Sequence, residues 1–447
     1  MNAAQTPHVV IIGAGFAGLE AAKTLRRAPA RVTLIDRRNH HVFAPLLYEV
    51  ATAALSPSDV ATAVRTVVYK SPNFFVQMAE VTGIDLAARR IDTHSAPIHY
   101  DHLILAAGAE PNYFGHPEWE THAPSLKDLT HALEIRRRIL SAYEAAELET
   151  DPVRKQELLT FIVIGGGPTG VELAGTMADV AHKTLACDFR RFDPNDTRIV
   201  LIEGGPRLLP AMKPELGDYA AETLRERGVE IRLGQMARRI DETGVTVGEE
   251  HIAAATVLWA AGVKASPLVA DLGTPLQKGH VVVERDLSIP GHREVFAVGD
   301  LMWFEQDGAP LPWVAQVALQ SGRHAARCIL ADFAKRPRAP FRYRHKGAVA
   351  SIARGKAVAE LPHATLTGLA AWLLAWVVHI FWLISRRDRF AVFLGWAYSY
   401  LTWRRDARLI LPQTNVEPRR PVLEAAPHDS REVAAIEHFE RFAERVP

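Results

Sequence analysis

The sequence predicts an α/β protein with two βαβ units and an apolar, helical C-terminal region. Short β-branched strands at residues 9–12 (VVII) and 160–164 (TFIVI) each run into a glycine turn and then into a helix-like segment. Further on, residues 366–385 contain no Asp, Glu, Lys or Arg. The two repeated units predict the fold class, and the apolar stretch predicts a separate C-terminal part.

Composition limits the classes of function. The 447 residues are 23% charged and 48% hydrophobic, which is typical of a folded chain with two or three domains. A formal net charge of +1 gives no field that would attract nucleic acid, so no nucleic-acid partner is expected. Cys187 and Cys328 are the only cysteines, which excludes a CxxC redox pair, and no metal site is expected. The N-terminus does not have the pattern of a secretory signal.

The first unit contains a G-x-G-x-x-G motif formed by Gly13, Gly15 and Gly18, between strand 9–12 and helix 16–27. The first glycine makes a tight turn, the second lets the backbone approach a pyrophosphate, and the third lets the helix pack on the strand. Asp36 ends the next strand, where a carboxylate can accept hydrogen bonds from a ribose diol. The unit therefore predicts a Rossmann-like dinucleotide site.

The second unit repeats this order. Its elements are strand 160–164, a helix-like segment at 171–185 and strand 198–203, and its glycines are Gly165, Gly167 and Gly170. Its acid is Glu203, which can accept from a 2′-hydroxyl and repel a 2′-phosphate. We therefore expect two dinucleotides, with NADH preferred over NADPH at the second site, although Arg207 would weaken that preference.

Three further short strands end in small or turn residues: 103–106 before Ala107 and Gly108, 257–260 before Ala261 and Gly262, and 294–298 before Gly299 and Asp300. The first two are expected to close one unit each.

The apolar stretch at 366–385 is long enough, as a helix of about 30 Å, to span a bilayer. Its three tryptophans and the basic stretch 386–408 favour a helix that lies in the membrane surface, with a span and a buried core helix as alternatives. His379 has no second ligand nearby, so we expect a hydrogen-bonded packing residue there.

With these motifs the chain resembles the type II NADH dehydrogenases, the single-subunit NADH:quinone oxidoreductases of the two-dinucleotide-binding-domain flavoprotein superfamily. The similarity runs from residue 9 to about residue 411. Besides both glycine motifs it includes FAPLLYEVATAALSPSDVATAVR, GGGPTGVELAG, VLWAAGV, VFAVGD, AQVALQ, WLLAWVVHIFWLISRRDRF and YLTWRRDARLI.

The resemblance implies an FAD-binding domain with an inserted NADH-binding domain and C-terminal membrane-associated helices. The expected boundaries are 1–112 and 286–362 for the FAD domain, 113–285 for the NADH domain, 363–411 for the membrane-attachment helices and 412–447 for a tail with an amphipathic helix. The residues implied to hold FAD are Gly13, Ala14, Gly15, Phe16, Ala17, Gly18, Asp36, Arg37, Val81, Ala107, Gly108, Gly299, Asp300, Ala315 and Gln316. Those implied to hold NADH are Gly165, Gly167, Thr169, Gly170, Glu172, Glu203, Ala261 and Gly262.

Glu172 is the first catalytic candidate. A carboxylate in the first turn of the second unit's helix is stabilised by the helix dipole, which would be a sufficient structural reason for it. The resemblance implies that it also lies at the reaction centre, where it positions substrate or relays protons.

Gln316 and Gln320 are the other two candidates. If their segment is helical they share one face, and neutral amides can donate to the carbonyl of a quinone without placing a charge in an apolar cavity. Taken alone, such a pair would usually face solvent. The resemblance implies that they contact a membrane quinone, either ubiquinone or menaquinone.

The predicted function is oxidation of NADH and reduction of a quinone through FAD, without proton pumping. The expected location is the cytoplasmic face of the bacterial inner membrane, with an anionic lipid surface and a second copy of the chain as partners. One alternative is a sulfide:quinone oxidoreductase that uses Cys187 and Cys328. Another is a membrane-attached flavin and NADH redox sensor that signals through its C-terminal helix.

Overall fold

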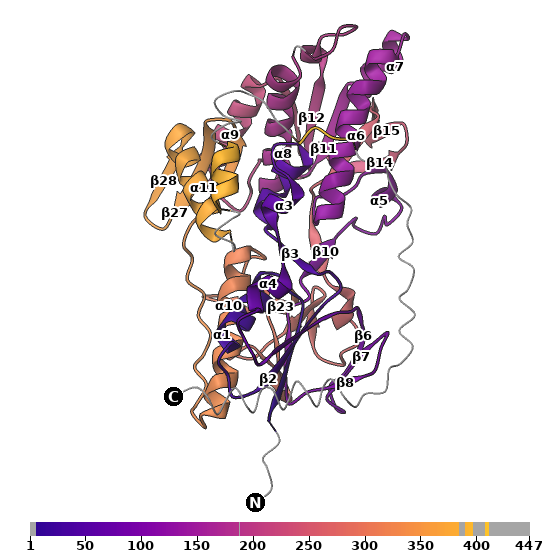
Figure 1. The fold of residues 1–447 in the computed structure, drawn as a ribbon. Helices are drawn as coiled ribbons and strands as arrows, with labels where there is room; N and C mark the ends of the chain where they lie inside the picture. Colours follow the sequence, from indigo (N-terminus) through magenta and orange to yellow (C-terminus); the bar gives the residue numbers. More distant parts are fainter. Residues whose placement is uncertain (1–5, 187, 384–388, 397–406, 411–447) are drawn as a thin grey trace, which may run out of the picture.

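The computed structural model describes residues 6–410 apart from 187, 384–388 and 397–406. Two parallel sheets organise these residues: one lies near the N-terminus at the bottom of Figure 1, and the other lies at the top. The last strands and helix α11 (Gly368–Trp382) form a third part at the side. The predicted tail helix after residue 412 lies outside the described residues.

The first sheet has its most buried strand in the middle. Its strand order is β21 (Ser288–Ile289), β22 (His292–Ala297), β9 (His102–Leu105), β1 (His8–Ile12), β2 (Arg31–Asp36) and β5 (Phe74–Met78). All adjacent strands in this sheet are parallel, except that β21 and β22 are antiparallel. Val9, Val10 and Ile11 are fully buried, as expected for a central strand covered on both faces. The chain leaves this sheet after β9 and returns to it with β21.

The second sheet is built in the same way around β11. Its order is β13 (Val229–Leu233), β12 (Arg198–Glu203), β11 (Thr160–Ile164) and β17 (Thr256–Trp259), all parallel. Helix α8 (Pro168–Asp179) begins three residues before the predicted helix and gives way to a π-helical turn at Val180–Thr184. The wider turn follows Asp179, a buried acid held by Arg227 and by the backbone N–H of Arg354.

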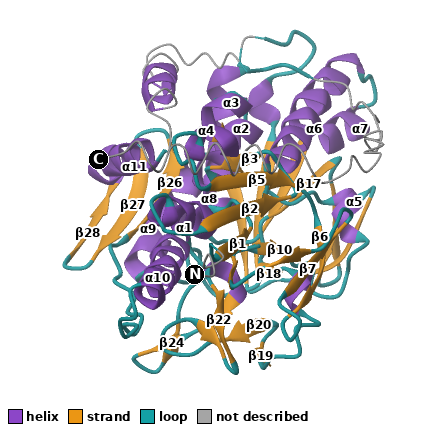
Figure 2. Cartoon of the chain, turned by 60° about the horizontal axis from the view of Figure 1, so that its bottom comes forward, coloured by secondary structure: helices purple, strands orange, loops and turns teal. Residues whose placement is uncertain are grey.

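The two helices that flank the first glycine turn pack closely. Helix α1 (Phe16–Leu25) lies against α10 (Ala315–Phe333), and both are seen on one side of the strands in Figure 2. A Cβ on Gly322 would lie 2.1 Å from the carbonyl oxygen of Ala17, so only glycine allows this approach.

The C-terminal part is an antiparallel sheet of β26 (Ala348–Ala353), β27 (Lys356–Leu361) and β28 (Ala364–Thr367), on which α11 packs. The predicted helix at 366–385 is therefore shorter than expected, because β28 takes its first residues. At 15 residues α11 is about 22 Å long. Among the described residues, no helix combines the length and the hydropathy needed to cross a bilayer. Residues 389–396 are also helical, and Trp396 stacks on Trp376 of α11.

The remaining elements are shorter or peripheral: β3 (His40–Val42), α2 (Leu47–Ala51), α3 (Pro57–Val60), β4 (Ala61–Ala63), α4 (Val64–Val68), β6 (Val81–Asp85), β7 (Arg90–Thr93), β8 (Ile98–His99), β10 (Ala109–Pro111), α5 (Trp119–His122), α6 (Leu129–Leu148), α7 (Pro152–Leu158), α9 (Pro214–Glu226), β14 (Ala237–Asp241), β15 (Gly244–Val247), β16 (Glu250–Ala253), β18 (Val263–Ala265), β19 (Leu276–Gln277), β20 (His280–Val282), β23 (Met302–Trp303), β24 (Glu305–Gln306) and β25 (Ala309–Pro310).

Candidate functional site

The first glycine turn has the geometry of a phosphate cradle. A Cβ on Gly13 would lie 2.3 Å from the carbonyl oxygen of Ala106, and one on Gly18 would lie 1.8 Å from that of Gly13. A Cβ on Gly15 would meet no heavy atom within 4 Å in the described part of the chain. The outer glycines are therefore required by packing, and the middle one opens onto free space at the N-terminus of α1, where a pyrophosphate would be stabilised.

The second turn repeats this arrangement atom for atom. A Cβ on Gly165 would lie 2.5 Å from the carbonyl oxygen of Ala260, and one on Gly170 would lie 1.8 Å from that of Gly165. Gly167, like Gly15, faces open space as far as the described residues go. Thr169 lies in the first turn of α8 beside it. Both turns therefore fit the same kind of ligand, a dinucleotide pyrophosphate.

The two acids hold the turns in the same way. Asp36 accepts hydrogen bonds from the backbone N–H of Ala14 at 2.7 Å and of Arg38 at 2.8 Å. Glu203 accepts from the N–H of Gly166 at 2.5 Å and of Gly205 at 2.6 Å. Because a carboxylate has about four acceptor positions, each acid keeps capacity for a ribose diol. The predicted positions of both acids, at the ends of β2 and β12, are confirmed.

The other predicted FAD positions lie on elements around this turn. Val81 begins β6, while Ala107 and Gly108 follow β9. Arg37 forms a surface ion pair with Glu110, 3.7 Å apart. Ala261 and Gly262 occupy the corresponding place after β17 in the second unit.

Asp300 lies in a short 3₁₀ turn after β22, and the N–H of its neighbour Gly299 donates to Ser321 Oγ of α10 at 3.0 Å. The Asp300 carboxylate forms an ion pair with Lys127, whose Nζ lies 3.6 Å from Asp300 Oδ2. Lys127 comes from the loop before α6, 173 positions away in the sequence, which is why the pairing gave no local signal.

Gln316 and Gln320 share a face of α10, as predicted, and both amides bind backbone rather than facing solvent. Gln316 Nε2 donates to the carbonyl of Gly347 at 2.8 Å, and its oxygen accepts from the N–H of Lys346 at 3.2 Å. Gln320 donates to the carbonyl of Arg344 at 2.9 Å and accepts from its N–H at 3.0 Å. The two side chains thus hold the extended segment that leads into β26. Ala315 is the first residue of the same helix.

Glu172 is buried where α8 meets β26, with 7% of its surface exposed. It is the fifth residue of α8, so it lies beyond the first turn, and the helix dipole does not explain it. Burial raises the pKa of Glu172 well above its usual range, the nearby Glu49 raises it further, and the N–H of Ser351, 3.2 Å from Oε1, opposes both. Burial and the charge of Glu49 therefore favour the protonated form of Glu172.

Glu49 is a residue that the sequence analysis missed. It lies on α2 and is 5% exposed, so two buried carboxyl groups from α2 and α8 act on each other between the two dinucleotide units. A signal existed: Glu49 is the single charged residue in the run PLLYEVATAAL. A carboxyl group whose pKa is raised by burial and by a second buried carboxyl group is a candidate functional residue, because its protonated form is favoured.

Cys328 does not have the properties of a nucleophile. It is buried on α10 with its Sγ 3.4 Å from His324 Nε2, and burial raises the pKa of its thiol to about 12. It is therefore a neutral thiol at physiological pH. Cys187 lies outside the described residues.

Comparisons with known proteins agree with this geometry. The family model described as pyridine nucleotide-disulphide oxidoreductase matches residues 7–322. The type II NADH:quinone oxidoreductases NdhA and Ndh of Mycobacterium tuberculosis are 41% and 42% identical over 424 and 422 residues, covering 91% of this chain and 89% and 90% of theirs. The chain belongs to the type II NADH:quinone oxidoreductases. As a member of this family it is an enzyme that oxidises NADH and reduces a quinone, with FAD as its cofactor.

Solved structures extend the comparison to the fold. NDH2 from Plasmodium falciparum in complex with NADH superposes with a TM-score of 0.84 at 21% identity, covering 91% of this type II enzyme and 100% of that chain. The sulfide:quinone oxidoreductase of Aquifex aeolicus gives a lower TM-score of 0.69 at 19% identity, covering 87% and 92%. The sulfide alternative is therefore the weaker match.

Proposed function

We propose that this type II enzyme holds FAD at the first glycine turn and NADH at the second, keeps a proton on Glu172 for the quinone, and works attached to a lipid surface. FAD, when bound, takes up two electrons from NADH and gives them to the quinone. The chain supplies the rest: Gly15 and Gly167 admit the pyrophosphates, and Asp36 and Glu203 orient the riboses. The single observation that carries the proposal is the matched geometry of the two turns.

Glu172 is proposed as the proton donor of the reaction centre. Reduction of a quinone to a quinol consumes two protons, so a buried, protonated carboxyl group near the point of electron transfer is useful. Glu49 supports this state, because its charge disfavours ionisation of Glu172. Gln316 and Gln320 stay as proposed quinone contacts, in addition to the backbone bonds that they already make.

Glu203→Gln is expected to reduce the preference for NADH over NADPH. The variant removes the negative charge that repels a 2′-phosphate, and loss of about 1.4 kcal/mol of discrimination would lower the ratio of kcat/KM values roughly tenfold. Glu249→Gln is the matched control, since Glu249 is a fully exposed carboxylate of the same unit. A ratio that stays the same in Glu203→Gln would contradict the proposed role of this acid.

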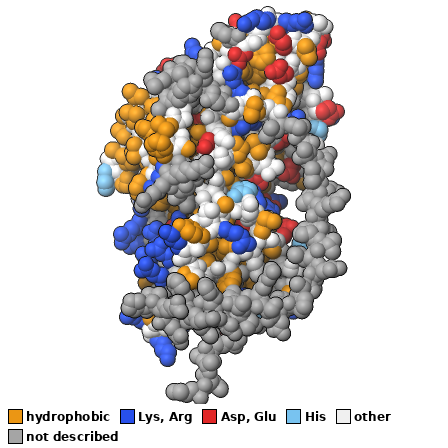
Figure 3. Space-filling view, in the orientation of Figure 1, with side chains coloured by type: hydrophobic (Ala, Val, Ile, Leu, Met, Phe, Trp, Pro, Cys, Tyr) orange, Lys and Arg blue, Asp and Glu red, His pale blue; other side chains and the backbone are white. Residues whose placement is uncertain are grey.

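Attachment to a lipid surface is proposed from the two faces of α11. Leu369, Leu373, Val377 and Phe381 recur every four residues and are 50–65% exposed. The opposite face, with Ala371, Ala375 and His379, is buried, and Ala371 packs with Ala357 and Ala359 of β27. Large apolar side chains thus point outwards and small ones inwards, the reverse of a soluble amphipathic helix. Figure 3 shows the hydrophobic side chains gathered over this part of the molecule.

His379 itself packs edge-on to Phe43, with ring centroids 6.3 Å apart. The hydrogen bond expected for it is not found within the described part of the chain, and burial lowers the pKa of its imidazole to about 4. It is therefore a neutral packing residue.

Replacing two residues of the exposed face, Leu373→Glu with Val377→Glu, is expected to lower partition onto lipid vesicles by roughly 10- to 100-fold. Each apolar side chain contributes about 1 kcal/mol or more when it enters the interface. Vesicle flotation measures the partition, and flavin content with thermal unfolding reports the fold. Leu148→Glu is the matched control, because Leu148 is 74% exposed on α6. Equal flotation of all three proteins would contradict attachment through α11.

Two finer predictions complete the proposal: a location on the cytoplasmic face of the bacterial inner membrane and a homodimer. Sedimentation velocity of the detergent-solubilised protein tests the second of these.

A further inference from the structure

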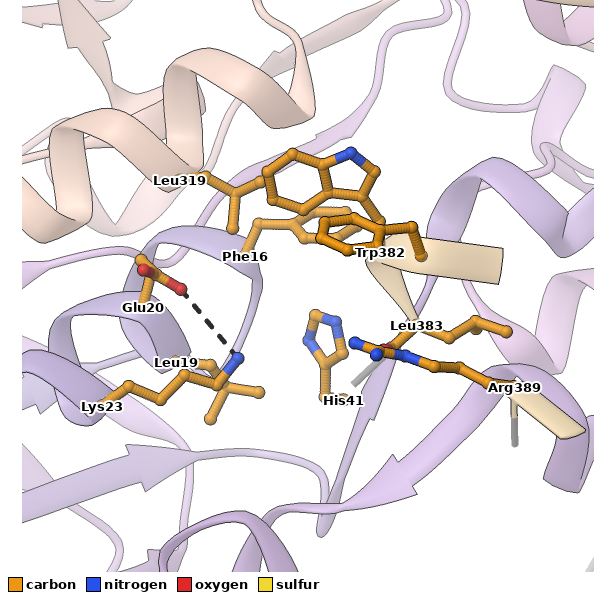
Figure 4. A pocket seen from close by; sticks show the side chains of 10 residues that line it. Phe16, Leu19, Glu20, Lys23, His41, Leu319, Trp382, Leu383 and Arg389 are labelled. Atoms are coloured by element: carbon orange, nitrogen blue, oxygen red, sulfur yellow. Dashed lines mark hydrogen bonds and ion pairs between the residues drawn. The ribbon is translucent and has the colours of Figure 1, made fainter. Parts of the chain in front are cut away.

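A pocket of about 190 Å³ lies between α1, α10, the last residues of α11 and the residues that follow α11 (Figure 4). Part of its lining is apolar: Phe16, Leu19, Leu319, Phe381, Trp382 and Leu383. The rest is polar or charged: Glu20, Lys23, His41 and Arg389. It lies along the side of α1, whereas the glycine turn opens at the N-terminus of that helix. Phe16, at the N-terminal end of α1, is also among the residues implied to hold FAD, whereas Lys23, His41 and Arg389 have no role in the mechanism proposed above.

The pocket has an excess of positive charge. Glu20 is the acid of its lining, and it is already bound by Arg323, whose Nε lies 2.8 Å from Oε1. Lys23 Nζ lies 3.9 Å from the other oxygen of Glu20. Among the described residues that line the pocket, Glu20 is the one acid, and the structure shows no ion pair between it and Arg389. Burial lowers the pKa of Lys23, and the charges of Arg323 and Arg389 lower it further. Among the described residues, Lys23 and Arg389 line this space and Arg323 acts on it from outside, against the one carboxylate of Glu20, which favours an anion.

His41 points into this space with one nitrogen unsatisfied. Its Nδ1 lies 2.9 Å from the carbonyl oxygen of Ala14, which can only accept, so Nδ1 carries the ring hydrogen. The Nε2 atom is buried and has no hydrogen-bond partner in the described structure, and the residue is 3% exposed. Burial lowers the pKa of His41 to about 4, so Nε2 keeps its lone pair at neutral pH. A buried acceptor of this kind requires a hydroxyl or N–H donor from a ligand.

The pocket continues into the exposed apolar face of α11. Phe381 lines the pocket and is 65% exposed, and Phe390, next to Arg389, is 66% exposed. The Arg389 guanidinium is held at this boundary, because its Nε donates to the carbonyl of Leu383 at 2.8 Å and its centre lies 5.6 Å from the Phe381 ring. A ligand that fills the pocket therefore has a polar, anionic, hydroxyl-bearing end and an apolar end that leaves along α11.

We infer that this pocket binds the headgroup of an anionic glycerophospholipid, with the phosphate at Lys23 and Arg389 and a headgroup hydroxyl donating to His41 Nε2. The inference rests on the proposed attachment to a lipid surface and adds to it one defined lipid site. A free phosphate has the same anionic chemistry, but it would leave the apolar lining and the adjoining face of α11 uncovered. We therefore assign the phosphate group in this pocket to a lipid headgroup.

The test compares flotation of the full-length, FAD-loaded enzyme with phosphatidylcholine vesicles that contain equal mole fractions of phosphatidylglycerol or phosphatidylserine. Both lipids carry one negative charge, but the glycerol headgroup offers hydroxyl donors, whereas the serine headgroup brings an ammonium group towards Lys23 and Arg389. The wild type is expected to bind phosphatidylglycerol vesicles about fivefold more tightly or better. Lys23→Gln with Arg389→Gln is expected to bring the ratio of the two affinities to about one.

Arg26→Gln with Arg27→Gln is the matched control, because these exposed residues directly follow the same helix and the charge change is identical. This variant is expected to weaken binding to both anionic vesicles and to keep their ratio, as loss of diffuse surface charge would. His41→Phe removes the acceptor while keeping an aromatic ring. This variant is expected to bring the ratio of the affinities for phosphatidylglycerol and phosphatidylserine vesicles to about one, and to retain the binding that depends on charge.

Each other outcome overturns the assignment. Equal binding of wild type to the two anionic vesicles, or a preserved ratio in the Lys23 and Arg389 variant, would refute the headgroup site while leaving membrane attachment intact. Loss of the preference on adding millimolar inorganic phosphate, but not sulfate, would show a site for soluble phosphate instead. Absence of binding to any vesicle would refute the proposed attachment itself.

Discussion

Gly15→Ala is expected to give a folded protein that has lost FAD, whereas Gly167→Ala is expected to keep FAD and to lose affinity for NADH. Both glycines have ordinary negative φ values of −71°, and in the described structure an added methyl group meets no protein atom within 4 Å. The methyl group would instead occupy the space that a pyrophosphate needs. Loss of one or two charge-assisted contacts, at about 1.5–3 kcal/mol each, corresponds to at least a tenfold loss of affinity for the dinucleotide.

Flavin absorbance per polypeptide measures the first effect, and the KM for NADH measures the second. Gly395→Ala is the control, because a methyl group there also meets nothing within 4 Å in the described structure and lies far from both turns in sequence. Gly18→Ala provides a contrast: its Cβ would lie 1.8 Å from a backbone oxygen, so misfolding is expected. Loss of flavin in Gly167→Ala with retention in Gly15→Ala would reverse the assignment of the two sites.

Glu172→Gln is expected to lower kcat for quinone reduction by roughly 100-fold, with unchanged flavin content. Removal of a proton donor typically costs 10²- to 10⁴-fold. In the wild type, kcat should fall as pH rises through the raised pKa of Glu172. This descending limb of the pH profile should be absent in the variant. Glu49→Gln removes the charge that raises this pKa, so the limb should move to lower pH. A variant Glu172→Gln with wild-type kcat and the same pH limb would contradict a proton-transfer role.

The same carboxyl group makes a prediction about stability. Its pKa in the folded state lies above its unfolded value, so between the two values the folded state binds more protons than the unfolded state. The free energy of unfolding therefore falls as pH rises through that window. Glu172→Gln should remove this dependence and be more stable than the wild type on the alkaline side. Urea unfolding at a series of pH values measures both.

The parts of the fold that follow from local pattern were predictable from the sequence. A β-branched run before a glycine turn specifies a buried parallel strand. Strands 160–164 and 198–203 were predicted to the residue, and so was the last residue of β2, Asp36. The acids at Asp36 and Glu203 could be placed because they end such strands. These features depend on neighbours in the sequence, which a pattern can report.

Features that depend on distant contacts could not be predicted in this way. Glu49 and Glu172 come from different units, and only the packing of α2 near α8 makes them a pair. The ion pair between Lys127 and Asp300 is equally non-local. The hydrogen bonds of Gln316 depend on where an extended segment 30 residues later crosses α10. In each case the chemistry of the side chain was visible and its partner was not.

NADH:quinone oxidoreductase activity requires electrons to pass from NADH through the flavin to a quinone on this chain. Anaerobic mixing of the purified, FAD-loaded protein with NADH, followed by a short-chain quinone, tests it most directly through flavin absorbance. We expect NADH to bleach the flavin and the quinone to restore its colour at a rate that matches turnover. Binding of NADH without bleaching, or bleaching by sulfide in its place, would contradict the account.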